Sequence, residues 1–364
     1  MAKFQTKLLF ISLFIVVNLI SFAAGDGSET ATLPPACITG TAGKCRNKPE
    51  ALKLKLIAIA SILVTSTIGV CLPLFSRAVP SLQPDRDLFV LVKAFASGVI
   101  LATGYMHVLP DSFDSLTSEC LPEYPWKKFP FTTFVAMLSA VLTLMVDSYA
   151  MSFYRKNNTT KSPAAAGGTN ENAVNNNGGK LESQDHDHTH GFHGTVNLND
   201  NAPQLLRYRI VAQVLELGIV VHSVVIGLSM GASDNTCTIR PLVAALCFHQ
   251  LFEGMGLGGC ILQAEYGMRI KTIMVFFFSS TTPFGIALGI GLSNVYSENS
   301  PTALIVVGML NACSAGLLNY MALVDLLAAD FMGAKLQQSF KLHTFAYFAV
   351  LLGAGGMSLM AVWA

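Results

Sequence analysis

Charged residues are scarce in this chain. Asp, Glu, Lys and Arg make up 12% of its 364 residues, against about 25% in an ordinary soluble domain. The net charge is +1, so there is no basic excess from which to build a nucleic-acid-binding surface. The chain also lacks His-Glu-x-x-His, the helical motif of zinc-dependent hydrolases. Apolar residues make up 52% of it instead, which indicates a polytopic membrane protein.

Residues 1–25 have the pattern of a secretory signal peptide. Lys3 and Lys7 precede an apolar core from Leu8 to Ile20, and small residues follow it at 21–25. The core is short for a membrane span, which needs about 20 residues. An uncleaved anchor is the alternative interpretation. Cleavage would leave the mature N-terminus on the extracytoplasmic side.

Eight apolar runs of membrane-spanning length follow, and they predict an all-α polytopic membrane protein. The predicted order is an extracytoplasmic segment at 26–51, three spans within 52–154, a cytoplasmic loop at 155–207, two spans within 208–262 and three within 263–364. The expected spans are Leu52 to Phe75, Leu88 to Leu109, Phe131 to Tyr154, Ile210 to Met230, Pro241 to Leu262, Ile273 to Leu292, Ala303 to Leu327 and His343 to Val362.

Two patterns support an orientation with both termini outside. The loops predicted to be cytoplasmic carry twelve Lys or Arg residues and the outside loops three, which follows the positive-inside rule. The basic residues at 44–55 run against it. Four cysteines fall in outside segments, where disulfides form, and four fall inside spans. We favour a bridge between Cys37 and Cys45, although sequence alone does not determine the pairing.

The predicted loop at 155–207 is rich in Asn, Gly and Ala, a composition that cannot bury a core and favours disorder. It contains a histidine tract flanked by carboxylates. Such a tract can catch a metal ion or sense its level without holding it rigidly. The alternative is a solvated linker with no such role. The histidines are His186, His188, His190 and His193.

The fourth and fifth predicted spans contain the most informative polar residues. His222 lies in one, and His249 and Glu253 lie in the other. Residues four apart share a helix face, so His249 and Glu253 can bind the same object. Ionisable groups inside a membrane normally face a partner, a cavity or an ion. Imidazole with carboxylate suits Zn, Fe or Mn. A hydrogen-bonded polar knot that joins two helices is the alternative.

The second predicted span ends with another histidine and carboxylate four residues apart. His107 and Asp111 lie at its outer end, and Asp114 follows. We expect an entrance that attracts cations by its negative charge; carboxylates that simply cap the span in water are the alternative. Pro110 can end the helix between the two side chains, which makes their shared face less certain.

Small residues recur at four-residue spacing within several spans, as at Gly227 and Gly231, Gly254 and Gly258, and Gly285 and Gly289. In lipid such rows let helix backbones approach closely. We therefore expect these positions to be helix-packing surfaces.

Two stretches resemble the paired signatures of the ZIP family of zinc- and iron-regulated transporter-like proteins. They are His-Ser-x-x-Ile-Gly-x-x-x-Gly at 222–231 and His-Gln-x-x-Glu-Gly at 249–254. The residues of these stretches are most similar to those of plant iron-regulated transporters. The resemblance implies inverted repeats of spans 1–3 and 6–8 around the central pair, with Ser223 and Gln250 beside the ion. Some relatives have a glutamate where this chain has Ile226, so we expect one transported ion at a time.

The expected function is uptake of divalent transition metal (Fe²⁺ or Zn²⁺, with Mn²⁺ and Cd²⁺ as further candidates) from outside or a lumen into the cytoplasm. We expect no enzymatic activity and no cofactor, since the metal is the substrate. The family resemblance suggests the plasma membrane. Homodimer formation and cytoplasmic regulators that bind the His-rich loop are further expectations. The alternatives are a membrane-embedded zinc-dependent hydrolase and a metal sensor that signals through that loop.

Overall fold

The computed structural model describes residues 45–75, 86–159, 201–293 and 300–360. Eight helices among them are long and apolar enough to cross a membrane, which confirms the predicted all-α polytopic architecture. The predicted signal peptide and histidine tract lie outside the described residues. The eight candidate spans are Lys48–Phe75, Asp87–Leu116, Phe131–Tyr149, Leu205–Ala232, Thr236–Gln263, Met268–Leu292, Pro301–Phe331 and Phe340–Met360.

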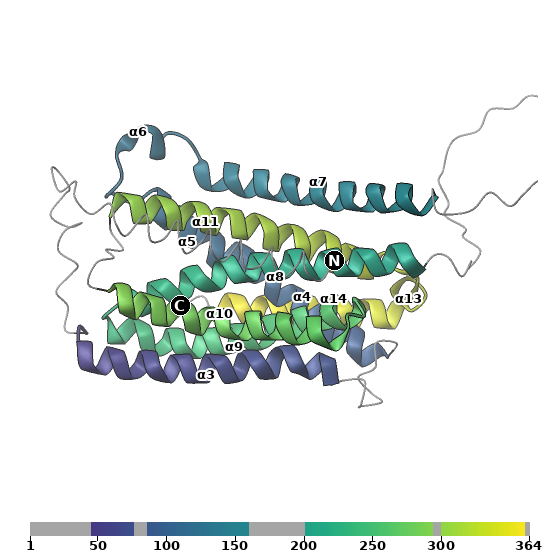
Figure 1. Ribbon diagram of the computed structural model, residues 1–364, viewed down its shortest axis with the longest axis horizontal. Helices are drawn as coiled ribbons and strands as arrows, with labels where there is room; N and C mark the ends of the chain where they lie inside the picture. The colour runs from purple at the N-terminus through teal and green to yellow at the C-terminus, as the bar shows by residue number, and fades with distance from the viewer. Residues whose placement is uncertain (1–44, 76–85, 160–200, 294–299, 361–364) are drawn as a thin grey trace, which may run out of the picture.

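The spans lie along one another in a single bundle (Figure 1). Short helices α6 (Glu123–Trp126) and α13 (Ala334–Gln337) lie between spans. The second span consists of α4 (Asp87–Thr103), η3 (Gly104–Val108) and α5 (Leu109–Leu116), and the seventh of α11 (Pro301–Tyr320), η4 (Met321–Ala328) and α12 (Ala329–Phe331). The others are α3 (Lys48–Phe75), α7 (Phe131–Thr159), α8 (Asn201–Ala232), α9 (Thr236–Gln263), α10 (Met268–Leu292) and α14 (Phe340–Met360).

Polar residues at the helix starts explain where several spans begin. Asn47 accepts a hydrogen bond from the Glu50 backbone N–H at 3.3 Å, and its amide reaches the Glu50 carboxylate. Asn235 caps α9 and Ser300 caps α11 in the same manner. These side chains satisfy N–H groups that have no partner within the helix. Helices α7 and α8 also extend into the region predicted as a loop, because a helix can continue through polar residues beyond the hydrocarbon.

The predicted glycine rows are helix-packing surfaces. Gly227 and Gly231 of α8 lie against the backbone of α10 near Thr282 and Ile286, while Gly254 and Gly258 of α9 lie against α3. A Cβ atom added to Gly227 would lie 2.6 Å from the Thr282 carbonyl oxygen. Only glycine allows this approach, so α8 packs on α10 and α9 packs on α3 as two close helix pairs.

Helix contacts pair off around the central helices α8 and α9. The extensive α3–α9 contact has its counterpart in α10–α8, the α4–α14 contact in α11–α7, and the smaller α4–α9 contact in α11–α8. Both interrupted spans, the second and the seventh, contain a π-helical segment. This is the contact pattern that an inverted repeat around a central helix pair produces, as the family resemblance implied.

The second span continues as a helix through Pro110, where the sequence allowed it to end. The π-helical segment η3 precedes the proline, and the Leu109 backbone N–H bonds to the Gly104 carbonyl, five residues back. Pro110 then occupies the first turn of α5, where a missing N–H costs little. His107 and Asp111 therefore belong to one continuous span.

One end of the bundle, which we call the disulfide end, holds the bond between Cys45 and Cys237. The predicted Cys37–Cys45 pairing is therefore wrong. The residues before α3 lie beside the α8–α9 connection, where Arg46 pairs with Asn235, so Cys45 meets a cysteine 192 residues away. Cys120 is also disulfide-bonded, and the four cysteines predicted inside spans are free.

Salt bridges explain why basic residues gather near the start of α3. Lys55 is buried, and its ammonium lies 3.7 Å from the Asp234 carboxylate. Arg46 lies 3.7 Å from the same carboxylate, and Arg240 pairs with Glu50. Part of the positive charge that ran against the predicted orientation is thus neutralised within the disulfide end.

Candidate functional site

The central helices bring His222, His249 and Glu253 together in the interior of the bundle. Their exposed fractions are 1%, 2% and 0%. The His222 and His249 ring centroids are 5.6 Å apart, and His249 Nε2 lies 3.1 Å from a Glu253 carboxylate oxygen. The shared helix face predicted for His249 and Glu253 is thus observed, and α8 adds the second imidazole.

A third imidazole, that of His107 in η3, joins this cluster. Its ring centroid lies 5.7 Å from that of His222 and 6.3 Å from that of His249. A point equidistant from three centroids with sides of 5.6, 5.7 and 6.3 Å lies about 3.4 Å from each. An imidazole-bound zinc ion lies roughly 3.2 Å from the ring centroid, because Zn–N bonds are about 2.1 Å. The spacing of the three rings therefore suits one metal ion.

The side chains are not oriented as ligands. No group of three His, Cys, Asp or Glu side chains among the described residues is arranged to hold a metal ion together. Glu253 lies close to His249 in distance, yet neither of its oxygens has hydrogen-bonding geometry to a partner in the described part of the chain. Both ring nitrogens of His222 also lack such a partner there. Buried polar groups without partners cost free energy. A cation bound in the cluster would give these groups a partner once their side chains had rotated toward it.

Neighbouring side chains fix the surroundings of the cluster. Thr103, one turn before His107, lies with its hydroxyl 3.3 Å from His249 Nδ1; sequence analysis missed it. The Gln250 amide donates to Thr282 Oγ1 at 2.6 Å, while Ser223 is buried. Gln250 is therefore engaged between α9 and α10, beside the cluster and without charge.

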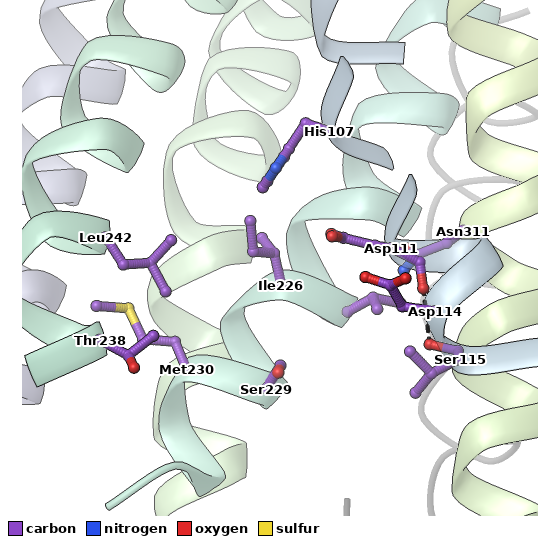
Figure 2. A pocket seen from close by; sticks show the side chains of 12 residues that line it. His107, Asp111, Asp114, Ser115, Ile226, Ser229, Met230, Thr238, Leu242 and Asn311 are labelled. Carbon is purple, nitrogen blue, oxygen red and sulfur yellow. Dashed lines mark hydrogen bonds between the residues drawn. The ribbon is translucent and has the colours of Figure 1, made fainter. Parts of the chain in front are cut away.

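A cavity of about 300 Å³ leads from the disulfide end to His107. Figure 2 shows Asp111 and Asp114 on one side of it and Ser229, Met230, Thr238 and Leu242 around the rest, with His107 pointing in from above. Asp114 is exposed, Asp111 is partly buried and His107 is 9% exposed. His107 thus lines the cavity and also contacts both central histidines, where sequence analysis assigned it to the entrance alone.

A family model described as "ZIP Zinc transporter" matches residues 52–361. The chain belongs to the ZIP family. It is 63% identical over 332 residues to rice "Fe(2+) transport protein 1" (88% of this chain and 87% of the rice protein), and 57% identical over 360 residues to Arabidopsis thaliana "Fe(2+) transport protein 1" (99% of each). It is also 55% identical over 354 residues to Arabidopsis "Zinc transporter 7" (96% of this chain, 97% of that protein).

Membership of the ZIP family confirms the recognition made from two short motifs. The relatives are plant proteins named for iron or zinc transport, as the sequence resemblance led us to expect. The site residues were predicted from polar side chains within the second, fourth and fifth spans. The structure brings His222, His249 and Glu253 together and lines the cavity with His107, Asp111 and Asp114.

Proposed function

We propose that this chain carries divalent transition metal ions across a membrane, from the disulfide end to the opposite end, where α7 ends and α8 begins. His107, His222, His249 and Glu253 would bind the ion, and Asp111 and Asp114 would attract it into the cavity. Ser223 and Gln250 lie beside the ion without charge. The site therefore holds one ion at a time, because Ile226 and Gln250 add no further carboxylate.

The observation that carries this proposal is the convergence of three imidazoles and a carboxylate in the buried centre of a membrane bundle. Three separate spans supply them, and one of the imidazoles also lines a cavity that leads to the disulfide end. A transport site must bind its ion without enclosing it, so that the ion can leave. Ligands that need to rotate before they bind, as His249 and Glu253 do, satisfy that condition.

The direction follows from the disulfide bonds. Disulfides persist in oxidising compartments and are rare in the cytoplasm. The end that carries the Cys45–Cys237 bond therefore faces outside or a lumen, and the cavity collects ions from there. The opposite end faces the cytoplasm, together with the predicted His-rich loop. The plasma membrane is the location that the family resemblance favours.

The ligand set suits Fe²⁺ and Zn²⁺, with Mn²⁺ and Cd²⁺ as competitors. Imidazole with carboxylate is of intermediate softness and binds all four. The names of the relatives point to the same two metals, iron and zinc. A competition assay among the four ions in one uptake experiment would rank them for this chain.

The test of the proposal is uptake of labelled zinc or iron into proteoliposomes or cells that carry the wild type, His249→Ala or Glu253→Ala. We expect both variants to lose uptake, because each removes a ligand from the buried cluster. His343→Ala is a matched control, since His343 stacks on Tyr347 with centroids 5.1 Å apart, away from the cluster. Unchanged uptake by His249→Ala at equal membrane abundance would disprove the site.

A further inference from the structure

Two cationic side chains pair with carboxylates of the seventh span at the end of the bundle opposite the disulfides. Lys93 of α4 places its ammonium 2.8 Å from Asp330 Oδ1 and 3.1 Å from the side-chain oxygen of Gln263, the last residue of α9. Arg207, near the start of α8, lies 3.2 Å from Asp325 Oδ1 in η4. Both helices that carry the central histidines are thus tied, at this end, to the second or seventh span.

Each pair joins a buried member to a more exposed one. The Lys93 and Asp325 side chains are 7% and 2% exposed, whereas those of their partners Asp330 and Arg207 are 28% and 38% exposed. A buried charge without a partner is strongly unfavourable, so such contacts hold firmly while they are matched. Unlike the close glycine packing of α8 on α10, they depend on a few atoms that can separate and exchange for water. They can therefore serve as a reversible closure.

The disulfide end of the bundle is open in the same structure. There the 300 Å³ cavity reaches His107 between α5, α8, α9 and α11. The cavity thus reaches the cluster at His107 from the disulfide end, while His222, His249 and Glu253 stay buried, and the contacts of Lys93 and Arg207 lie at the other end. We propose that these contacts form a latch that must open before an ion can leave the cluster toward the cytoplasm. The ion's passage rests on the proposed function; the existence of the latch does not.

Cys260 offers a direct readout of this latch. It is a free cysteine with 2% exposure, one helical turn before Gln263 on α9. Replacement of Cys71, Cys247 and Cys313 by serine leaves it as the only free cysteine of the described residues. The rate at which a membrane-impermeant, anionic thiol reagent modifies Cys260 in inside-out vesicles then measures how often this end opens.

The variants to compare are Lys93→Gln, Arg207→Gln and the double variant, each in that background and without metal. We expect modification of Cys260 to accelerate, by roughly tenfold in the double variant, as the open population grows. Without the neighbouring positive charge, the site would attract the anionic reagent less strongly. A smaller fraction of Cys260 would also be in the reactive thiolate form. Both direct effects slow the reaction, so neither can account for an acceleration. An unchanged rate in the double variant would overturn the latch.

Two further measurements separate a latch from general loosening. Lys128→Gln removes an exposed ion pair with Glu123 at the disulfide end and should leave the rate unchanged. The charge exchange Arg207→Asp with Asp325→Arg should restore the slow rate in a folded protein. If Cys260 in the exchanged variant reacts as fast as in Arg207→Gln, the Arg207–Asp325 pair is not part of the latch.

A reporter in the cavity tests whether the two ends alternate. Ser229→Cys, at the cavity wall, should react more slowly from the disulfide end when the latch is broken. If Cys260 reacts faster while the rate at the Ser229→Cys reporter is unchanged, the end that carries Lys93 and Arg207 has only loosened locally. The proposal then fails. Metal flux is measured separately. A chain that carries no metal but shows both changes would refute the proposed function and leave the latch standing.

Discussion

The two interrupted spans invite comparison, because each contains a π-helical segment and each uses it differently. In the second span, η3 turns His107 toward His222 and His249, near the cavity. In the seventh span, η4 places Asp325 against Arg207 at the opposite end of the bundle. The contact pattern relates these spans to one another, yet one brings an imidazole to the histidine cluster and the other brings a carboxylate to an ion pair.

This difference shows how a repeated architecture can give its two ends separate tasks. A π-helical turn widens the helix and shifts the side chains after it, which is why such turns are frequent at functional sites. In the second span the side chain is the His107 imidazole, a group that can bind metal when it is neutral. In the seventh span it is the Asp325 carboxylate, whose negative charge is already neutralised by the Arg207 guanidinium. Substitutions in each segment can test this division.

The largest effect is expected from His107→Ala in η3. The variant removes the one imidazole that contacts both central histidines and also lines the cavity. Uptake should fall by roughly 10- to 100-fold, the scale found when groups around a bound metal are removed. Initial uptake rates of labelled zinc at equal surface abundance are the measurement.

The control for His107→Ala is again His343→Ala, which should keep its uptake. If His107→Ala transports normally, η3 supplies no ligand and the comparison between the two segments loses its basis. A loss confined to the apparent KM would instead place His107 in the entrance alone.

A smaller effect is expected from Asp111→Asn. Asp111 lies in the cavity wall four residues after His107 and does not contact the central cluster in the manner of Glu253. Loss of one negative charge should raise the KM for metal roughly fivefold, because a charge pair a few ångströms apart in water is worth about 1 kcal/mol. The maximal rate should stay close to that of the wild type.

Uptake measured at two ionic strengths gives the control for Asp111→Asn. The wild type should lose more of its affinity in high salt than the variant, because screening acts on the charge that the variant lacks. A fall in maximal rate with unchanged KM would show that Asp111 acts on the bound ion and not on its entry.

A third effect, on stability and not on uptake, is expected where the two interrupted spans meet. A Cβ atom on Gly104, the first residue of η3, would overlap the Asn319 side-chain oxygen just before η4. Gly104→Ala should therefore lower stability by about 1–3 kcal/mol, the usual cost of overpacking, seen as a lower melting temperature in detergent. Adding Asn319→Ala should recover most of it. No recovery in the double variant would locate the strain in the π-helical backbone instead.

Much of the architecture could be predicted because lipid imposes strong rules. Eight apolar runs, the scarcity of charge within them and the rows of small residues follow directly from the need to satisfy backbone groups and pack helices in hydrocarbon. The helix face shared by His249 and Glu253 follows from helical spacing alone. These features are local in sequence, so the sequence contains them.

The features that could not be predicted join residues far apart in the chain. The Cys45–Cys237 bond depends on α3 lying along α9, and the contact of His107 with His222 depends on a π-helical turn that no apolar pattern reveals. The contacts of the buried Lys93 are of the same kind, because its partners Asp330 and Gln263 lie in other spans.

The Cys45–Cys237 bond also fixes an order of events during biosynthesis. The two cysteines are separated by 192 positions, so the first must wait for four further spans to emerge before its partner exists. At about 5–20 residues per second, the wait is roughly 10 to 40 s. In the proposed orientation Cys45 would spend that interval as a thiol in an oxidising lumen, open to capture by the cell's disulfide exchange enzymes. Correct pairing thereby reports that the first four spans, which lie between the two cysteines, have been inserted in the right sequence.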